Sequence, residues 1–299
     1  MQVVFGKNYA KLAHSLKGKL MKIIMLFLVS FLSFFSAFAY GKVFIGSDSS
    51  QFRNPFIQPQ DPPLSGGDRD QTLQFGDILF GTAREDIIIG ALGADVIFAQ
   101  GGDDIIIGGS EGGNPFSRDR VFAGEGDDLF VWAPGDGTDF IDFGRGNDIL
   151  LVGVFGLQNG NDLIFPINNT QRFLKPFLDP TTGFPIVDAL NAPGFCEILD
   201  DSDSAGTAKG LSELGIENVV RFVLRQVRND FENGVQNTDN GLRVSLHVKG
   251  LELLICANRD GSAIDVIDLR VNPPSIKPIG SAPQKIKNIL RSLQPGTGV

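Results

Sequence analysis

A column of evenly spaced aspartates constrains this sequence more than any other feature. Between residues 76 and 165 the aspartates recur nine residues apart; after a six-residue insertion the spacing resumes and then loosens. The column consists of Asp77, Asp86, Asp95, Asp104, Asp119, Asp128, Asp139, Asp148 and Asp162. A fixed period means that one small unit is repeated and that stacked copies bury a continuous core.

A large apolar residue stands two positions after each aspartate. These residues are Leu79, Ile88, Ile97, Ile106, Val121, Phe130, Ile141, Leu150 and Ile164. Glycines precede many of the aspartates, as in residues 124–128, and glycine permits the positive φ of a tight turn. Alternate side chains of a strand point to opposite faces. Each unit therefore predicts a six-residue turn followed by a short strand whose middle residue points into the core.

The pattern resembles the hemolysin-type, or RTX, calcium-binding nonapeptide repeat, G-G-x-G-x-D-x-U-x, in which U is a large apolar residue. The resemblance covers about residues 76–165. It implies a parallel β-roll in which two repeats make one turn, so that loops two repeats apart stack along one edge with calcium ions between them. Calcium takes six to eight oxygen ligands at about 2.3–2.6 Å. Carbonyl groups of the turns and aspartate carboxylates would supply these oxygens.

Stacking of this kind gives the roll two edges. The first edge carries Asp77, Asp95, Asp119 and Asp139, and the second edge carries Asp86, Asp104, Asp128 and Asp148. The second edge has the better glycine turns. On the first edge, Phe75 and Ser117 stand where the motif has glycine, and Asn114 and Pro115 replace a glycine pair. The resemblance therefore favours calcium beside Asp104, Asp128 and Asp148 over calcium near Asp77 and Asp119.

The candidate calcium ligands include both aspartates and glycines. They are Asp86, Asp95, Gly102, Asp104, Gly124, Gly126, Asp128, Gly135, Gly137, Asp139, Gly144, Gly146 and Asp148. The alternative is a β-roll that has lost calcium and is held together by its apolar core alone.

The charge of the chain supports ion binding. Its net charge is −9, and residues 61–150 alone contain 18 acidic and 5 basic side chains. Such a surface repels nucleic acid and anionic membranes and attracts cations. A solvated acidic surface would explain the charge but not its regular phasing, so we expect calcium ions and no nucleic acid as partners.

The N-terminal residues have the pattern of a targeting signal. Lys17, Lys19 and Lys22 precede an apolar run, residues 23–39, that ends in Ala-Phe-Ala. Residues 1–39 therefore predict a secretory signal peptide and a secreted, extracellular or periplasmic protein. The alternative is an uncleaved anchor, which would be the one contact with a membrane. Residues 40–74 are expected to form a linker or a segment that covers the roll.

The strands of the roll are apolar on both faces, as in residues 87–89 and 105–107, which are all isoleucine. Strands of this kind are typical of sheets that are buried on both sides. The outer face needs a cover, either the rest of this chain, which we favour, or another copy or an outside surface.

Residues 75–168 are thus assigned to the roll, and residues 169–299 to a small α+β unit of unknown role. Val219, Phe222, Val223 and Val227 recur at helical spacing and predict an amphipathic helix that ends near residue 234. Residues 242–248, 251–257 and 263–271 predict about three antiparallel strands. Residues 283–293 predict a short helix. The fold class is mainly β, a parallel β-roll of RTX-type repeats followed by this unit.

Cys196 and Cys256 are the only cysteines, and in an exported protein they are a candidate disulfide. Two separate buried thiols are the alternative. The sequence contains no H-E-x-x-H, G-x-S-x-G or phosphate-binding P-loop motif, and His247 is the only histidine after residue 39. These observations favour an exported, non-catalytic calcium-binding protein. The alternatives are an adhesion module that binds surface polysaccharide or itself, and an extracellular hydrolase with its site in residues 169–299.

Overall fold

The computed structural model describes residues 42–46, 76–110, 119–159, 162–165, 176–199, 215–224 and 243–291. All of them belong to one compact unit, residues 42–299. The predicted signal peptide and most of residues 40–74 lie outside the described residues. Within the described ranges, no helix has the length and apolar character needed to cross a membrane.

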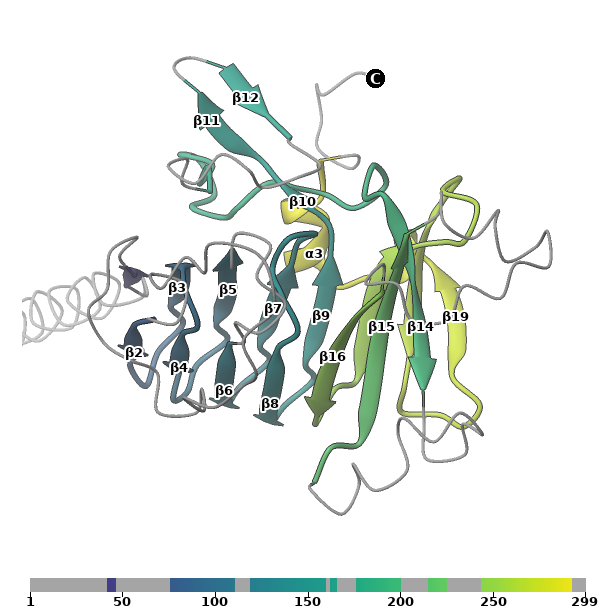
Figure 1. The fold of residues 1–299 in the computed structure, drawn as a ribbon, viewed down its shortest axis with the longest axis horizontal. Helices are drawn as coiled ribbons and strands as arrows, with labels where there is room; N and C mark the ends of the chain where they lie inside the picture. Colours follow the sequence, from purple (N-terminus) through teal and green to yellow (C-terminus); the bar gives the residue numbers. More distant parts are fainter. Residues whose placement is uncertain are drawn as a thin grey trace, which may run out of the picture. The chain divides into compact units, whose positions relative to one another are not determined.

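Two large sheets make up most of this unit (Figure 1). The first sheet runs in the order β1 (Val43–Ile45), β3 (Ile87–Leu92), β5 (Ile105–Ser110), β7 (Leu129–Trp132), β9 (Ile149–Val152), β17 (Leu253–Ala257), β18 (Ile264–Asp268) and β19 (Ser275–Pro278). The second sheet runs in the order β2 (Ile78–Phe80), β4 (Val96–Phe98), β6 (Arg120–Glu125), β8 (Phe140–Arg145), β16 (Arg243–Lys249), β15 (Asn218–Leu224) and β14 (Gly194–Leu199).

Smaller elements complete the described structure. They are the antiparallel pairs β10 (Val154–Phe155) with β13 (Val187–Asp188) and β11 (Leu157–Asn159) with β12 (Asp162–Ile164), the 3-10 helix η3 (Ile279–Ser281) and the helix α3 (Gln284–Ile289).

The parallel β-roll predicted from the repeats is confirmed. From β2 to β9 the chain alternates between the two sheets, and every pairing between successive turns is parallel, which gives about three turns. The apolar residue of each repeat points inward, and Ile88, Ile97, Ile106, Val121, Phe130, Ile141 and Leu150 are fully buried in one cluster between the sheets. The apolar residues that recur in the sequence two positions after each aspartate thus form the core of successive turns of the roll.

The last position of the column departs from this arrangement. Asp162 begins β12, which pairs antiparallel with β11, so it starts a hairpin instead of another turn of the roll. Ile164 packs against the cluster outside the first sheet and not between the two sheets. The prediction of a repeat at Asp162 is therefore wrong.

The chain returns to the roll much later in the sequence. β16 pairs parallel with β8 and β17 pairs parallel with β9, so that Val248 lies in register with Ile141 and Leu254 with Leu150. Val248 and Leu254 are fully buried in the same core as the repeats. Residues 243–257 therefore add one more turn to the roll, although no nonapeptide motif marks them.

Beyond this added turn both sheets continue with antiparallel strands. β18 and β19 extend the first sheet, and β15 and β14 extend the second. A separate small α+β unit is therefore not confirmed, because these strands share the sheets and the core of the roll. The predicted strands at residues 242–248, 251–257 and 263–271 correspond to β16, β17 and β18, and the predicted short helix at 283–293 to α3.

The helix predicted to begin at Val219 is wrong, because residues 218–224 form the strand β15. Val220 and Phe222 face the core between the sheets, whereas Val219 packs with Ile216 in a smaller cluster. A strand buried on both faces has apolar residues at consecutive positions, and this pattern mimics helical spacing. The rest of that predicted helix lies outside the described residues.

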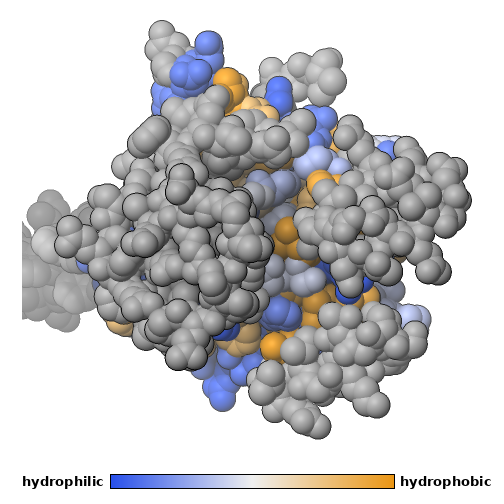
Figure 2. All heavy atoms as spheres, in the orientation of Figure 1, coloured by the Kyte–Doolittle hydropathy of each residue, from blue (hydrophilic) through white to orange (hydrophobic). Residues whose placement is uncertain are grey.

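The outer face of the first sheet is covered by the chain itself, as predicted. Ile89, Ile105 and Ile107 pack in one buried cluster with Ile286 and Ile289 of α3. The outer face of the second sheet is more open. There Phe80, which is 57% exposed, stacks on Phe98 with ring centroids 5.3 Å apart, and Phe98 stacks in turn on Phe122. Polar and apolar residues are interspersed on the visible described surface (Figure 2).

Two contacts across the core tie the sheets together. A disulfide joins Cys196 of β14 to Cys256 of β17, with their Cα atoms 6.1 Å apart. The ring of Trp132 on β7 packs against Phe222 on β15, with centroids 5.1 Å apart. The disulfide thus links β14 of the second sheet to β17 of the first sheet, and the ring contact links β15 of the second sheet to β7 of the first sheet.

Candidate metal centre

The repeat aspartates form two hydrogen-bonded ladders, one along each edge of the roll. In each ladder the backbone N–H of one aspartate donates to Oδ1 of the aspartate one turn later. On the second edge these bonds join Asp86 to Asp104 (2.7 Å), Asp104 to Asp128 (2.9 Å) and Asp128 to Asp148 (2.8 Å). On the first edge they join Asp77 to Asp95 (2.5 Å), Asp95 to Asp119 (2.7 Å) and Asp119 to Asp139 (3.0 Å). The two edges expected from the resemblance are therefore present as continuous rows of carboxylates.

The second ladder has a partner at each end. Lys42 N–H donates to Asp86 Oδ1 (2.7 Å), and Asp148 N–H donates to Glu252 Oε2 (2.7 Å). Glu252 thus takes the place of the next aspartate in the turn that β16 and β17 add. Sequence reasoning missed Glu252, although it stands two residues before the inward-facing Leu254, just as each aspartate precedes its apolar residue.

The ladder leaves one oxygen of each buried carboxylate unused. Among the residues that the structure describes, Oδ2 has no hydrogen-bond partner in Asp95, Asp104, Asp119, Asp128 and Asp148, whose side chains are at most 1% exposed. Buried polar atoms in proteins are normally satisfied, and a buried charge needs a partner of opposite sign. The rows of unsatisfied oxygens therefore fit a hard cation, which takes oxygen ligands.

The titration of these groups points the same way. Burial raises the pKa of Asp104 and Asp148 to about 8 and the pKa of Asp128 to about 7. Repulsion from the neighbouring carboxylates of the ladder adds to the effect for Asp104 and Asp148. At pH 7 a large fraction of these carboxyl groups is therefore protonated, and a bound cation would favour the ionised form.

The turns stack too closely for side chains at several glycine positions. A Cβ on Gly126 would overlap the carbonyl oxygen of Gly102, and a Cβ on Gly146 would overlap that of Gly126. Positive φ angles occur at Gly102, Gly124, Gly126, Gly135, Gly137 and Gly144. The glycines named as candidate ligands therefore lie in the stacked turns beside the carboxylates.

The first edge contains more acidic groups than the sequence argument assigned to it. One carboxylate oxygen from each of Asp119, Asp136 and Asp139 lies within 4.8 Å of the other two, and all three side chains are at most 1% exposed. Asp119 and Asp136 were not among the candidate ligands. Asp119 follows an interrupted turn, and Asp136 occupies a variable position of the motif, so the repeat pattern gave no signal for either.

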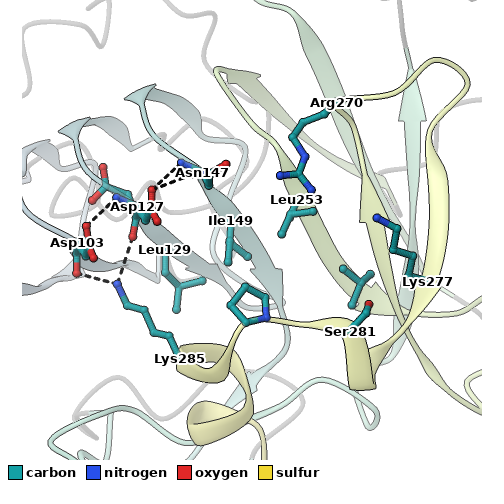
Figure 3. A pocket seen from close by; sticks show the side chains of 13 residues that line it. Asp103, Asp127, Leu129, Asn147, Ile149, Leu253, Arg270, Lys277, Ser281 and Lys285 are labelled. Atoms are coloured by element: carbon teal, nitrogen blue, oxygen red, sulfur yellow. Dashed lines mark hydrogen bonds between the residues drawn. The ribbon is translucent and has the colours of Figure 1, made fainter.

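A lysine from the C-terminal helix reaches the second edge. Lys285 Nζ on α3 donates to the carbonyl oxygens of Asp103 (2.7 Å), Asp104 (3.1 Å) and Asp127 (3.4 Å), as Figure 3 shows in part. Burial lowers the pKa of Lys285. A cavity of about 380 Å³ lies beside it, with Arg270 and Lys277 on the opposite wall. Lys285 compensates part of the negative potential of this edge, but it does not bond to the unsatisfied carboxylate oxygens.

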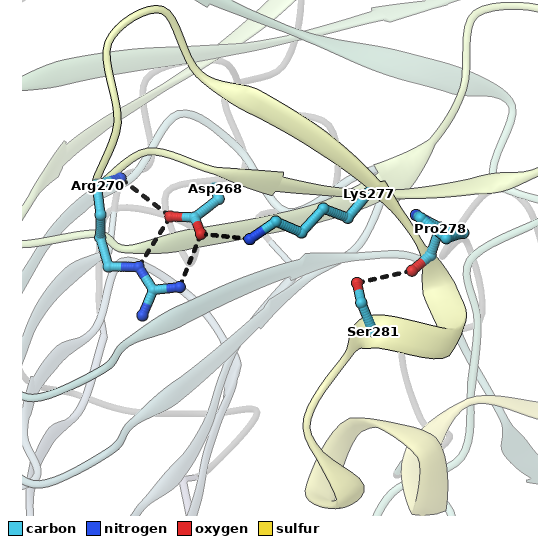
Figure 4. A network of polar contacts seen from close by, with 5 residues as sticks. All are labelled: Asp268, Arg270, Lys277, Pro278 and Ser281. Carbon is cyan, nitrogen blue, oxygen red and sulfur yellow. Dashed lines mark hydrogen bonds and ion pairs between the residues drawn. The ribbon is translucent and has the colours of Figure 1, made fainter.

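Asp268 shows how this chain satisfies a buried carboxylate without a metal. Arg270 Nη2 lies 2.7 Å and Lys277 Nζ 2.9 Å from Asp268 Oδ2 (Figure 4). Hydrogen bonds from Arg270 and Lys277 hold the pKa of Asp268 well below its usual range. Within the described ranges, no lysine or arginine bonds in this way to the buried Oδ2 atoms of Asp95, Asp104, Asp119, Asp128 and Asp148, and a bound cation would supply the charge that compensates them.

Comparison with known proteins agrees with this chemistry. The model of the RTX calcium-binding nonapeptide repeat matches residues 77–112 and 135–150, with four copies. Neither the curated proteins nor the solved structures gave a match. RTX nonapeptide repeats bind calcium, and calcium is accordingly the cofactor of this roll.

Proposed function

Since the chain carries RTX calcium-binding nonapeptide repeats, we propose that it is an exported scaffold protein whose β-roll is stabilised by calcium ions between its stacked turns, without a catalytic role. The observation that carries this proposal is the row of buried Oδ2 atoms that lack a hydrogen-bond partner in the described structure. Calcium supplies the positive charge and the oxygen coordination that these atoms need.

On the second edge, Asp104, Asp128 and Asp148 would hold the ions, together with oxygens of the glycine turns at residues 100–103, 124–127 and 144–147. Asp95, on the first edge, would take part in the same way. Asp86, at the start of the second ladder, would be a weaker ligand, because its Oδ1 accepts the N–H of Lys42 and its Oδ2 accepts hydrogen bonds from Thr82. Because these carboxylates are drawn into alignment only by folding, the free energy of calcium binding becomes free energy of folding.

Export is supported by two features of the chain. The N-terminal 39 residues have the basic, apolar and small-residue pattern of a signal peptide. The disulfide between Cys196 and Cys256 is typical of proteins that fold in an oxidising compartment. In a cytosol poor in calcium the roll would stay loosely folded, and it would become rigid after export.

The use of the buried acidic groups supports a structural role. Among the described residues, every buried carboxylate lies in the stacked turns or, like Asp188 and Asp268, is paired with arginine or lysine. A general acid or base needs a carboxylate that can reach a substrate. An activity screen in calcium buffer against polysaccharides, lipids and peptides would reveal a hydrolase if this proposal is wrong.

Calcium titration of the purified chain tests the central claim. We expect circular dichroism and calorimetry to show a large gain of order and of melting temperature as calcium is added, and magnesium at the same concentration to have a much smaller effect. A melting temperature that is the same in calcium and in chelator would refute the proposal.

A further inference from the structure

The turn at residues 133–139 differs from the other turns of the roll because it carries an aspartate in its interior. The N–H of Asp136 donates to the carbonyl oxygen of Ala133 (3.0 Å), which folds the turn back on itself. The indole Nε1–H of Trp132 donates to the carbonyl oxygens of Asp136 (3.0 Å) and Gly137 (3.2 Å). The indole is fully buried, so this turn is anchored to the core of the roll.

The Asp136 carboxylate is buried and is not satisfied by the residues that the structure describes. It is 1% exposed, and within the described residues neither of its carboxylate oxygens has a hydrogen-bond partner. Its carboxylate lies instead beside those of Asp119 and Asp139, with oxygens within 4.8 Å of one another. Three carboxylates cannot all be ionised at such distances without a cation.

The backbone of β5 leaves room for this cluster. A Cβ on Gly108 would overlap Asp119 Oδ2 and would lie 3.4 Å from Asp136 Oδ1. Both carboxylates can therefore approach the strand only because residue 108 is glycine. The space is thus shaped by three separate parts of the chain, namely β5 and the residues that precede β6 and β8.

We infer that Asp119, Asp136 and Asp139 form a calcium site on the first edge, in which Asp136 adds a carboxylate from outside the ladder to two carboxylates of the ladder, and that this site binds calcium more tightly than the sites of the second edge. This inference rests on the proposed calcium-binding function and adds to it a specific site that does not follow the nonapeptide pattern. The interrupted turn before Asp119 does not abolish binding, because Asp136 supplies a further carboxylate.

The spacing of the oxygens suits one ion of this kind. Calcium binds oxygen at about 2.4 Å, so ligands on opposite sides of the ion lie about twice that distance apart, and all three carboxylate oxygens fit within this limit. A site with three carboxylates binds a hard cation more tightly than a site with fewer, because ligand charge sets affinity in calcium proteins.

Terbium luminescence tests the site in the full chain, because Tb³⁺ replaces calcium at oxygen sites and Trp132 is the only tryptophan. With excitation of the indole, the calcium-free protein should show terbium emission that saturates at a single ion per chain and disappears when calcium is added. Asp136→Asn should weaken the terbium affinity by at least about tenfold, because even outer partners of metal ligands change affinity by that factor.

The matched control is Asp260→Asn, which removes one exposed carboxylate far along the sequence from the stacked turns. Its Oδ1 accepts hydrogen bonds from Ser262, which asparagine can also accept, so the indole-sensitised emission should be unchanged. The inference is overturned if Asp136→Asn titrates like the wild type, or if Asp260→Asn loses as much emission as Asp136→Asn does.

The wild type provides a second measurement should the Asp136 variant fail to fold. Terbium held by buried carboxylates keeps few water ligands, so its emission lifetime should change little between H₂O and D₂O; a severalfold longer lifetime in D₂O would mean a surface ion and overturn the inference. Calcium that stabilises the protein while no sensitised emission appears would refute this site alone. Absence of both effects would refute the proposed function as well.

Discussion

Replacement of Asp128 by asparagine should make the stability of the protein depend far less on calcium. Asp128 lies in the middle of the second ladder, where its Oδ1 accepts the N–H of Asp104 and its own N–H donates to Asp148. In Asp128→Asn the remaining carbonyl oxygen can keep the bond from Asp104, which is 2.9 Å long. The substitution therefore removes the unsatisfied Oδ2 and its charge while it leaves the ladder intact.

The size of the effect follows from the position of Asp128 between two neighbours of the same kind. An ion on each side would use its carboxylate. One ion at a concentration about 100 times its dissociation constant stabilises the folded state by about 2.7 kcal/mol. The affinity of extracellular calcium modules, about 10⁻⁴ M, places this condition near 10 mM calcium. Loss of both ions would therefore lower the free energy of unfolding by about 5 kcal/mol.

Without calcium, the difference in free energy of unfolding between Asp128→Asn and the wild type should have the opposite sign. Burial raises the pKa of Asp128 to about 7, so at pH 8 the calcium-free wild type contains a buried charge that is unfavourable. Asparagine removes that charge, and the calcium-free variant should be at least as stable as the wild type. Denaturant unfolding followed by circular dichroism, with calcium and after its removal, measures both differences.

The adjacent residue provides the control. Asp127 is exposed, and its Oδ1 accepts the N–H of Asn147 (2.9 Å), a bond that asparagine can also accept. Asp127→Asn removes the same charge and should change stability by less than about 0.5 kcal/mol in calcium, as is usual for surface substitutions. If both variants lose equal stability in calcium, or if the loss at Asp128 persists without calcium, the ladder does not hold the ions.

Three further predictions concern the rest of the fold. Replacement of Cys196 and Cys256 by serine should lower the free energy of unfolding by about 4 kcal/mol, as expected for a cross-link over 60 residues, and denaturant unfolding of the variant in calcium measures it. Leu254→Ala should lower the free energy of unfolding by about 2–5 kcal/mol, because Leu254 is fully buried in the core of the roll. Leu163→Ala in the hairpin should lower it far less, because Leu163 is 39% exposed, and equal losses for the two variants would contradict the added turn. Asp104, Asp128 and Asp148 keep their protons up to about pH 7–8 in the folded state but only up to about pH 4 in the unfolded state, so the calcium-free protein should lose stability as the pH rises from 5 to 8. Thermal melts without calcium should show this loss, and melts with calcium should show that the stabilisation by calcium increases over the same pH range.

The roll could be predicted from the sequence because the pattern that specifies each turn lies within nine residues and is repeated along the chain. Each aspartate predicts the position of the apolar residue that follows it, and Ile97, Ile106 and Val121 all point into the core as expected. Repetition also identified the second row of carboxylates. The same reasoning failed at Asp162, where the spacing had already loosened and the chain forms a hairpin instead.

Three of the strands after residue 170, β16, β17 and β18, were predicted from the sequence, but the pairing of β16 and β17 with the roll was not, because their partners β8 and β9 lie far away in the sequence. Val219 and Phe222 have the spacing of a helix, and only the position of β15 between two other strands shows that both of its faces are buried. Asp136 was missed for a similar reason. Its position in the motif is variable, and its role depends on Asp119, which reaches it through the fold.

The added turn at residues 243–257 has a consequence for how the molecule is assembled. The bond from Asp148 to Glu252 spans 104 residues, so the contact order of this end of the roll is high and its closure must be slow. Until that happens, β8 and β9 are terminal strands with unpaired backbone groups, and such an end can template another chain. A chain that stops before residue 243 would keep this adhesive end permanently, and we expect it to stack end to end into filaments. The return of the chain to its own roll acts as a cap that keeps a repetitive structure finite.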